Sequence, residues 1–219
     1  DPESIMSVIV GKKKEEIDMI EKVADKSLKE LKGIYEHGES YEGQEKVWFF
    51  NSEESVWGEI MNMLKSSKNY VCSTAKMDVW AKGVKNEKIS LSFLKAINNG
   101  AKIEVILPLQ MRDYIKDFLT KSWLNVFVHK NFSTRIIDED KILYGFLATD
   151  YESFGLGFEK PGVGIYGGIK VTDSMITTGM IDYFKTLWNM ALPIENELRR
   201  EMQKTLKNME ERKIPAKNH

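Results

Sequence analysis

Residues 96–108 read Ala96-Ile97-Asn98-Asn99-Gly100-Ala101-Lys102-Ile103-Glu104-Val105-Ile106-Leu107-Pro108. The segment 86–98 carries apolar side chains at helical spacing, and Asn99-Gly100 is a typical helix stop. The run after it is rich in β-branched residues and predicts a buried strand over 102–108. A helix, a tight stop and an apolar strand form half of a β-α-β unit, so this stretch predicts an α/β domain.

The rest of the chain repeats this alternation. Ser52 is a suitable N-cap for a helix that starts after it, and Thr172 or Asp173 can cap another. We therefore predict a mixed β-sheet flanked by helices. Strands are expected at 46–50, 69–74, 102–108, 125–128, 135–138, 142–146, 153–158 and 163–171, and helices at 52–64, 86–98, 109–120, 172–188 and 194–212.

An N-terminal helix is expected over residues 12–37. Its apolar positions recur at steps of three and four, which is the pattern of a seam between helices. Two interpretations stay open: the seam packs on its own domain, or it joins two copies of the chain. The expected organisation is a helical linker and dimerisation segment (1–43), an α/β effector domain (44–193) and a charged C-terminal helix with its tail (194–219). The seam residues are Ile17, Ile20, Ala24, Leu31 and Ile34.

Composition narrows the class of protein. The 219 residues are 42% hydrophobic and 30% charged, with 32 basic against 33 acidic side chains, a balance typical of a globular protein and unlike a free-standing DNA-binding domain. No apolar run approaches the length needed to cross a bilayer, so we expect a cytoplasmic protein without membrane contact. The single cysteine and the scattered histidines predict no metal site, and no cofactor is expected.

One segment carries a chemical pattern, His129-Lys130-Asn131-Phe132-Ser133-Thr134-Arg135-Ile136-Ile137-Asp138. It resembles the active-site strand of the phospholipase D superfamily, His-x-Lys-x-x-x-x-Asp. With the aspartate aligned on Asp138, Asn131 takes the histidine position and Ser133 the lysine position. The resemblance implies a phospholipase-D-like fold. Because an amide is no nucleophile and a hydroxyl carries no charge for a phosphate, it also implies a chain that is not an enzyme.

The candidate binding residues come from the same strand. Asn131, Ser133 and Arg135 share one face by period-two spacing, whereas Asp138 lies three positions after Arg135 and points to the other side. Either this set lines a vestigial ligand cleft, or Arg135 pairs locally and Asp138 caps the turn. The glycines of 162–168 fit a hairpin, with a phosphate cradle as the alternative. Lys82, Lys85 and Lys88 indicate a solvated basic face.

A second resemblance covers residues 5–195. The linker helix, the Asn-Asn-Gly-Ala-Lys strand, Arg135 to Leu143 and the segment Phe184 to Pro193 occur in the order found in TrmB-like transcriptional regulators. It implies a non-catalytic effector-sensing and dimerisation module, with a homodimer, a small-molecule effector, and DNA contacted only through an N-terminal winged helix missing here. The alternatives are a phospholipase-D-type phosphodiesterase or nuclease with unusual residues, and a ligand-free scaffold for protein partners.

Overall fold

The computed structural model describes residues 46–112, 120–160, 162 and 164–211. The chain divides into two compact units, Asp1–Gln44 and Glu45–His219, and every described residue belongs to the second. The expected seam helix at 12–37 lies outside the described residues, as does most of the helix expected at 109–120.

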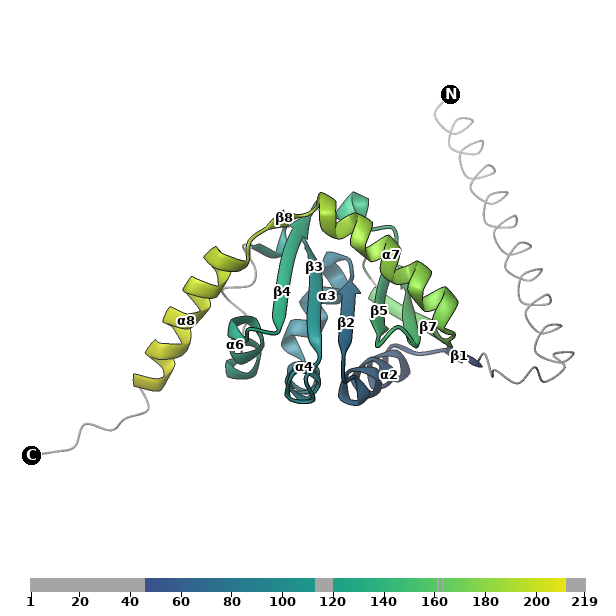
Figure 1. Cartoon of the computed structure of the whole chain (residues 1–219), viewed down its shortest axis with the longest axis horizontal. Coiled ribbons are helices and arrows are strands. Elements are labelled where there is room, and N and C mark those ends of the chain that lie inside the picture. Colours follow the sequence, from purple (N-terminus) through teal and green to yellow (C-terminus); the bar gives the residue numbers. More distant parts are fainter. Residues whose placement is uncertain (1–45, 113–119, 161, 163, 212–219) are drawn as a thin grey trace, which may run out of the picture. The chain divides into compact units, whose positions relative to one another are not determined.

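An eight-stranded mixed sheet forms the centre of the second unit (Figure 1). Its spatial order is β1-β7-β6-β5-β2-β3-β4-β8. The pairs β2–β3 and β3–β4 are parallel and the other pairs are antiparallel, so the predicted mixed sheet is confirmed. The strands are β1 (Lys46–Phe50), β2 (Tyr70–Thr74), β3 (Lys102–Pro108), β4 (Phe132–Ile137), β5 (Gly145–Thr149), β6 (Ser153–Lys160), β7 (Gly164–Thr172) and β8 (Leu192–Pro193).

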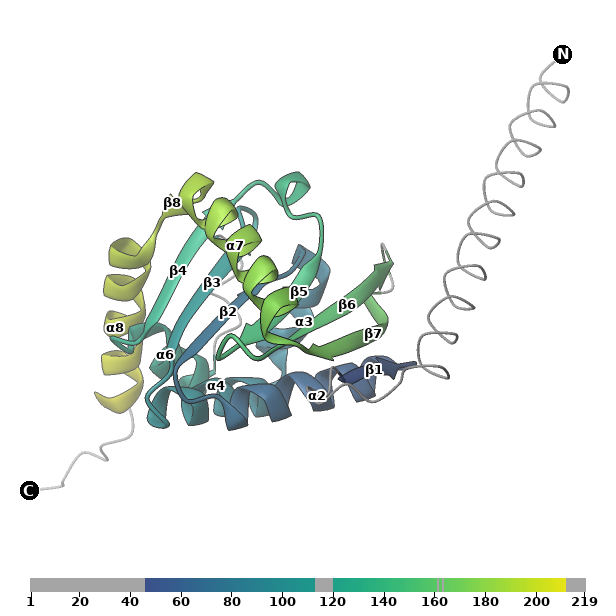
Figure 2. The same ribbon diagram turned by 45° about the vertical axis from the view of Figure 1, so that its right-hand side comes forward.

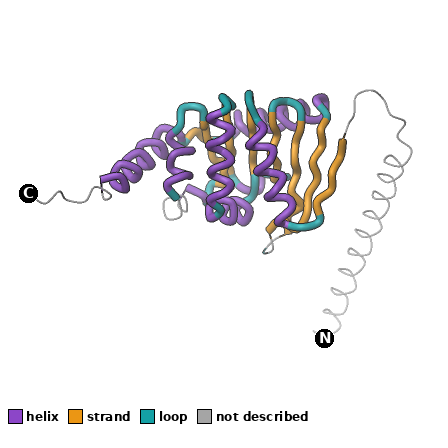
Figure 3. The backbone as a smooth tube through the Cα atoms, turned by 90° about the horizontal axis from the view of Figure 1, so that it is seen from below, coloured by secondary structure: helices purple, strands orange, loops and turns teal. Residues whose placement is uncertain are grey.

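Helices cover both faces of the sheet (Figures 2 and 3). One buried cluster joins α2, α3, α4, α6 and α8 to one face, where Val71, Ile103 and Val105 point. A second cluster joins α7 to the other face, where Cys72 and Ile106 point. The helices are α2 (Glu53–Ser66), α3 (Met77–Lys85), α4 (Glu87–Asn98), α6 (Lys121–Val128), α7 (Ser174–Met190) and α8 (Glu195–Glu211), with a short 3₁₀ turn η1 (Glu139–Lys141).

Local signals place several helix ends where the sequence predicts them. The Ser52 hydroxyl accepts from the Ser55 N–H, and the Asp173 carboxylate accepts from the Ile176 N–H, so each satisfies a free donor of a first turn. Gly100 adopts φ of 104°, and the helix closes where the Ala101 N–H bonds to the Ala96 carbonyl oxygen. These caps fix the starts of α2 and α7 and the end of α4.

Two predicted elements need correction, and one helix was not predicted. Residues 125–128 are not a strand but the end of α6, because the Thr120 side chain caps a helix whose Trp123, Leu124 and Phe127 are buried along one side. The strand expected at 142–146 begins only at Gly145, because η1 and an extended loop take up the preceding residues. Helix α3 carries no prediction at all from the sequence.

The C-terminal helix α8 packs on the domain beside α6 and β4. Met202, 2% exposed, inserts into the larger cluster. The Arg199 guanidinium donates to the carbonyl oxygens of His129 and Phe132, at 3.3 and 3.0 Å. No helix within the described ranges combines the length and apolar character that a bilayer crossing requires.

Candidate functional site

Strand β4 holds the residues expected to form a vestigial site. Its side chains alternate between buried and half-buried, so Ser133 and Arg135 face α7 while Phe132 and Thr134 face the opposite helices. Asn131 is half-buried and immediately precedes the strand. The structure therefore brings Ser133 and Arg135 to one face.

Arg135 is anchored to the end of α7. Its Nη1 donates to the Trp188 carbonyl oxygen at 2.7 Å, and its guanidinium carbon lies 4.7 Å from the centroid of the Trp188 ring. A guanidinium stacked on an indole and bonded to a helix-end carbonyl gains both cation–π and hydrogen-bond energy. This side chain thus joins β4 to α7 rather than pointing into open space.

Asp138 lies apart from Ser133 and Arg135, beyond the last residue of β4. It is exposed and precedes η1, and its side chain makes no capping hydrogen bond to that turn. Its backbone carbonyl accepts from the Lys141 N–H at 3.0 Å instead. The turn cap expected from the Asp138 side chain is therefore not formed.

His129 is the one histidine in the described part of the chain, and it closes α6. Its Nδ1 accepts from the Asn131 N–H at 3.1 Å. Burial lowers the pKa of its imidazole, and the positive charges of Lys130 and Arg199 lower it further. His37 and His219 lie outside the described residues, so no second imidazole faces His129 within them.

A polar group that the sequence did not indicate, centred on Glu104, adjoins Ser133. Glu104 is the register partner of Ser133 on β3. Its carboxylate accepts from the Tyr70 hydroxyl at 2.7 Å and pairs with the Lys102 ammonium. Burial raises the pKa of the Tyr70 phenol. The register partner of Ser133 is thus an ion-paired carboxylate, which leaves no free positive charge at that point for a phosphate.

The sequence matches no family model and no curated protein. Its structure resembles Nuc from Salmonella typhimurium, a phospholipase D family member, with a TM-score of 0.51 and 10% identity over 68% of this chain and 98% of that one. It also resembles NucT from Helicobacter pylori, with a TM-score of 0.50 and 10% identity over 69% of this chain and 100% of that one. The chain has a phospholipase-D-like fold. The structure is also similar to that of TrmBL2, an archaeal chromatin protein that binds DNA, with a TM-score of 0.54 and 14% identity over 89% of this chain and 71% of that one.

The phospholipase-D-like domain also contains a cavity on the face of the sheet opposite α7. The cavity measures about 70 Å³ and lies between α2, α3 and strands β5 to β7. Its walls are largely apolar and include the indoles of Trp57 and Trp80. Glu159 is the acidic side chain of β6 that lines it. Glu59 of α2 also lines it, and its carboxylate pairs with the Lys170 ammonium at 2.8 Å. This concave, mostly apolar site with two acidic side chains has the general character of a ligand pocket.

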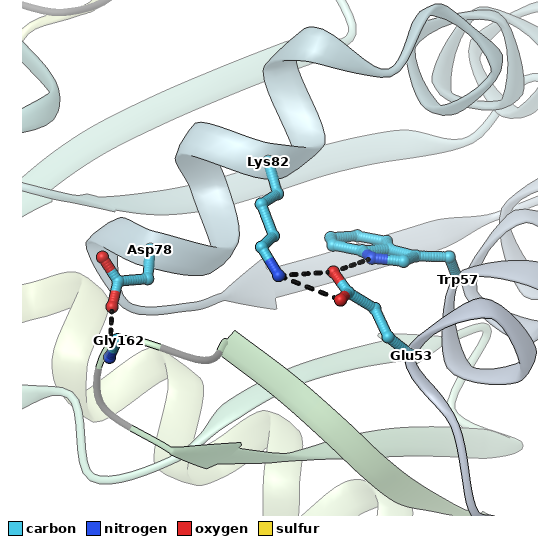
Figure 4. Close-up of polar contacts among 5 residues, drawn as sticks. All are labelled: Glu53, Trp57, Asp78, Lys82 and Gly162. Carbon is cyan, nitrogen blue, oxygen red and sulfur yellow. Dashed lines mark hydrogen bonds and ion pairs between the residues drawn. The ribbon is translucent and has the colours of Figure 1, made fainter.

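A polar network lies around this cavity (Figure 4). The Lys82 ammonium on α3 donates to both Glu53 oxygens on α2 at 2.9 Å, and the Trp57 indole N–H donates to the same carboxylate at 3.2 Å. The Lys82 hydrogen bond, above all, lowers the pKa of Glu53. Lys82 thus belongs to a specific pair, although the sequence indicated only a solvated basic face.

The network extends to the hairpin between β6 and β7. The Gly162 N–H donates to the Asp78 carboxylate at 3.4 Å (Figure 4). Gly162 and Gly164 have φ of 73° and 87°, which supports the hairpin predicted for these glycines. Helix α3 is therefore joined by polar contacts to α2 on one side and to the hairpin on the other.

Proposed function

We propose that the chain is the non-catalytic effector-sensing and dimerisation module of a TrmB-like transcription regulator acting in the cytoplasm. The likeness in fold to TrmBL2, which binds DNA, supports the link to transcription. The nearly equal numbers of basic and acidic side chains fit a module that does not itself bind DNA. DNA is then contacted by a winged-helix domain outside these 219 residues.

The observation that carries the non-catalytic assignment is the chemistry of β4. Asn131 and Ser133 occupy the positions that align with a nucleophilic imidazole and a cationic lysine. Neither an amide nor a neutral hydroxyl replaces these groups in phosphoryl transfer. The neighbour of Ser133 is the Glu104 carboxylate, and the nearby guanidinium of Arg135 is engaged by Trp188.

Hydrolysis of bis(p-nitrophenyl) phosphate tests this assignment. We expect the wild type, Asn131→Ala and Ser133→Ala to show the same rate as buffer alone. Gly179→Ala on the exposed side of α7 serves as the matched control for purification and handling. A rate above background that falls in Asn131→Ala but not in Gly179→Ala would establish the phosphodiesterase alternative.

Dimerisation is tested on the seam predicted at Ile17, Ile20, Ala24, Leu31 and Ile34. We expect sedimentation velocity to show a dimer for the wild type and a shift toward monomer for Ile20→Asp, because a buried carboxylate is costly in an apolar seam. Lys22→Asp, which introduces the same group two positions away, should leave the dimer intact. A wild type that stays monomeric at high concentration contradicts the proposal.

A further inference from the structure

The cavity beside Glu159 exists because glycines occupy the part of the sheet that α2 and α3 cover. Gly145 on β5 is the register partner of Gly157 on β6, and Gly155 lies on the same face two residues away. Glycine adds no side chain to the floor, so these positions leave a hollow that other residues would fill. At about 70 Å³, it exceeds several-fold the roughly 10–15 Å³ that one water requires, which gives room for a molecule of one ring.

A β-bulge directs Glu159 to this hollow. The β6–β7 register shifts between Phe158 and Glu159, and Glu159 then pairs with the buried Ile165. A Cβ on Gly145 would overlap the Glu159 Oε1 atom, so the glycine reserves space for the carboxylate. Its position therefore depends on two features, a bulge on its own strand and a glycine on the next one.

One oxygen of the Glu159 carboxylate lacks a hydrogen-bond partner within the described structure, although the positive charge of Lys76 acts on the group. Glu159 Oε1 is buried and has no hydrogen bond, and the indole Nε1 of Trp80, a residue 7% exposed in the cavity wall, has none either. Buried polar groups without partners are costly and uncommon in folded proteins. A bound molecule that supplies the missing hydrogen bond would remove this cost.

The walls define the chemistry of that molecule. Trp57 and Trp80 present indoles, which favour flat apolar groups and attract cations to their faces. A carboxylate acceptor at one end of an aromatic cavity matches an ammonium group, which provides both positive charge and N–H donors. A carboxylate ligand would meet the like charge of Glu159 and is disfavoured.

We propose that this cavity is the effector site and that it binds a small aromatic amine, with its ring between the indoles and its ammonium on Glu159. The inference rests on the proposed sensing function and names the site and the chemical class of its ligand. The site is separate from Ser133 and Arg135 of β4, because these two residues lie on the face of the sheet that α7 covers. It joins three elements, α2, α3 and the β6–β7 hairpin, whose contacts a ligand would change.

Benzylamine is the probe, with benzyl alcohol and benzoate as isosteric comparisons. Titrations follow the indole ¹H–¹⁵N signals of the full chain, assigned with Trp57→Phe and Trp80→Phe. We expect benzylamine to shift the Trp57 and Trp80 signals and benzoate to leave them unchanged. Glu159→Gln should weaken benzylamine at least tenfold while leaving the affinity for benzyl alcohol unaltered, because the amide has nearly the same size as the carboxylate but lacks its negative charge.

A second pair of variants tests the cavity itself. A Cβ on Gly157 lies 3.4 Å from the Ile165 side chain, so Gly157→Ala fits the fold while reducing the hollow, and it should weaken both benzylamine and benzyl alcohol. Gly155→Ala is the substitute if Gly157→Ala folds poorly, and it should weaken both ligands in the same way. The atom nearest to its added Cβ is the sulfur of the flexible Met63 side chain, at 3.3 Å. Gly179→Ala, with open space around it, should change neither affinity.

The inference is overturned if benzylamine shifts neither indole, if benzoate binds as tightly, or if Glu159→Gln leaves the benzylamine affinity unchanged. Such a result leaves the proposed function standing whenever phosphodiester hydrolysis stays at background. Conversely, hydrolysis that depends on Asn131 removes the proposed function even where benzylamine binds as expected. The two failures are therefore distinguishable.

Discussion

The guanidinium of Arg135 lies over the Trp188 ring, 4.7 Å from its centroid, while its Nη1 donates to the Trp188 carbonyl oxygen. This pair fastens the end of α7 to β4. We expect Arg135→Met to destabilise the protein by about 2 kcal/mol, since a hydrogen bond from a charged group contributes 1.5–3 kcal/mol and a cation–π contact adds to it. Urea unfolding followed by circular dichroism measures the loss.

Arg200→Met on α8 is the control for this prediction, because Arg200 is exposed. Its effect should stay within about 0.5 kcal/mol, as for most surface substitutions. Equal losses in the two variants would show that the Trp188 contact adds no stability.

Asp150 is predicted to fix the loop before β2. Its carboxylate accepts three backbone N–H groups, from Lys68, Asn69 and Tyr70, at 2.8 to 2.9 Å. Its φ of 54° suits Asp or Asn better than most residues. We expect Asp150→Ala to cost about 2–3 kcal/mol and Asp150→Asn less, because Asn keeps the backbone preference and one acceptor oxygen.

Thermal unfolding at matched pH measures this difference. Asp182→Asn, at an exposed helix position that pairs with Lys185 at 3.6 Å, should change stability by less than about 0.5 kcal/mol. If Asp150→Ala were as mild as Asp182→Asn, the three N–H bonds would contribute nothing to the fold.

Glu159 should make stability depend on pH. Burial raises the pKa of its carboxyl above the ordinary value of 4.5; Lys76 opposes the shift, and Glu139 and Asp78 add to it. Because the folded state binds this proton more tightly than the unfolded chain, its contribution is fully present below pH 4.5 and is lost as pH rises through the folded-state pKa.

Glu159→Gln removes that titration. We therefore expect the variant to be more stable than the wild type at pH 7, and the difference to shrink as the pH approaches 4. Denaturant midpoints at a series of pH values give the comparison. A difference that is constant across the series would mean that Glu159 titrates normally.

Gly145 and Glu159 should be energetically coupled. A Cβ on Gly145 would overlap the Glu159 Oε1, so Gly145→Ala forces that side chain to move and should cost about 1–3 kcal/mol, as overpacking does. In a Glu159→Ala background the cost should fall, because the overlapping atom is absent. The double-mutant cycle from urea unfolding measures the coupling, and additive losses would contradict it.

Much of the fold was predictable because its signals are local. Ser52, Asp173 and Gly100 mark helix ends by side-chain capping or backbone conformation, which needs no knowledge of distant residues. The apolar run at 102–108 is long enough to identify β3. A short apolar run can be either a strand or a helix. Residues 125–128 are helical because Thr120 caps a helix that begins at Lys121, four residues before the strand that the sequence predicted.

The candidate site was less accessible, because it depends on pairing between distant strands. The β4 pattern placed Ser133 and Arg135 on one face, but the contact of Arg135 with Trp188 spans 53 positions. The hollow requires Gly145 to lie opposite Gly157, and Glu159 reaches it only through a bulge. The alternation of Gly155 and Gly157 along one strand was a usable sign of missing side chains on one face.

One row of the sheet runs through four strands, Phe50–Gly168–Gly157–Gly145. It starts on β1, the strand that follows residues 1–44 in the chain, and ends on β5 at the glycine that reserves space for Glu159. A Cβ on Gly168 would overlap the Leu156 carbonyl oxygen, so this crossing is tight and tolerates little slippage. The row therefore connects the first strand of the sheet to the floor of the cavity through three consecutive strand pairings.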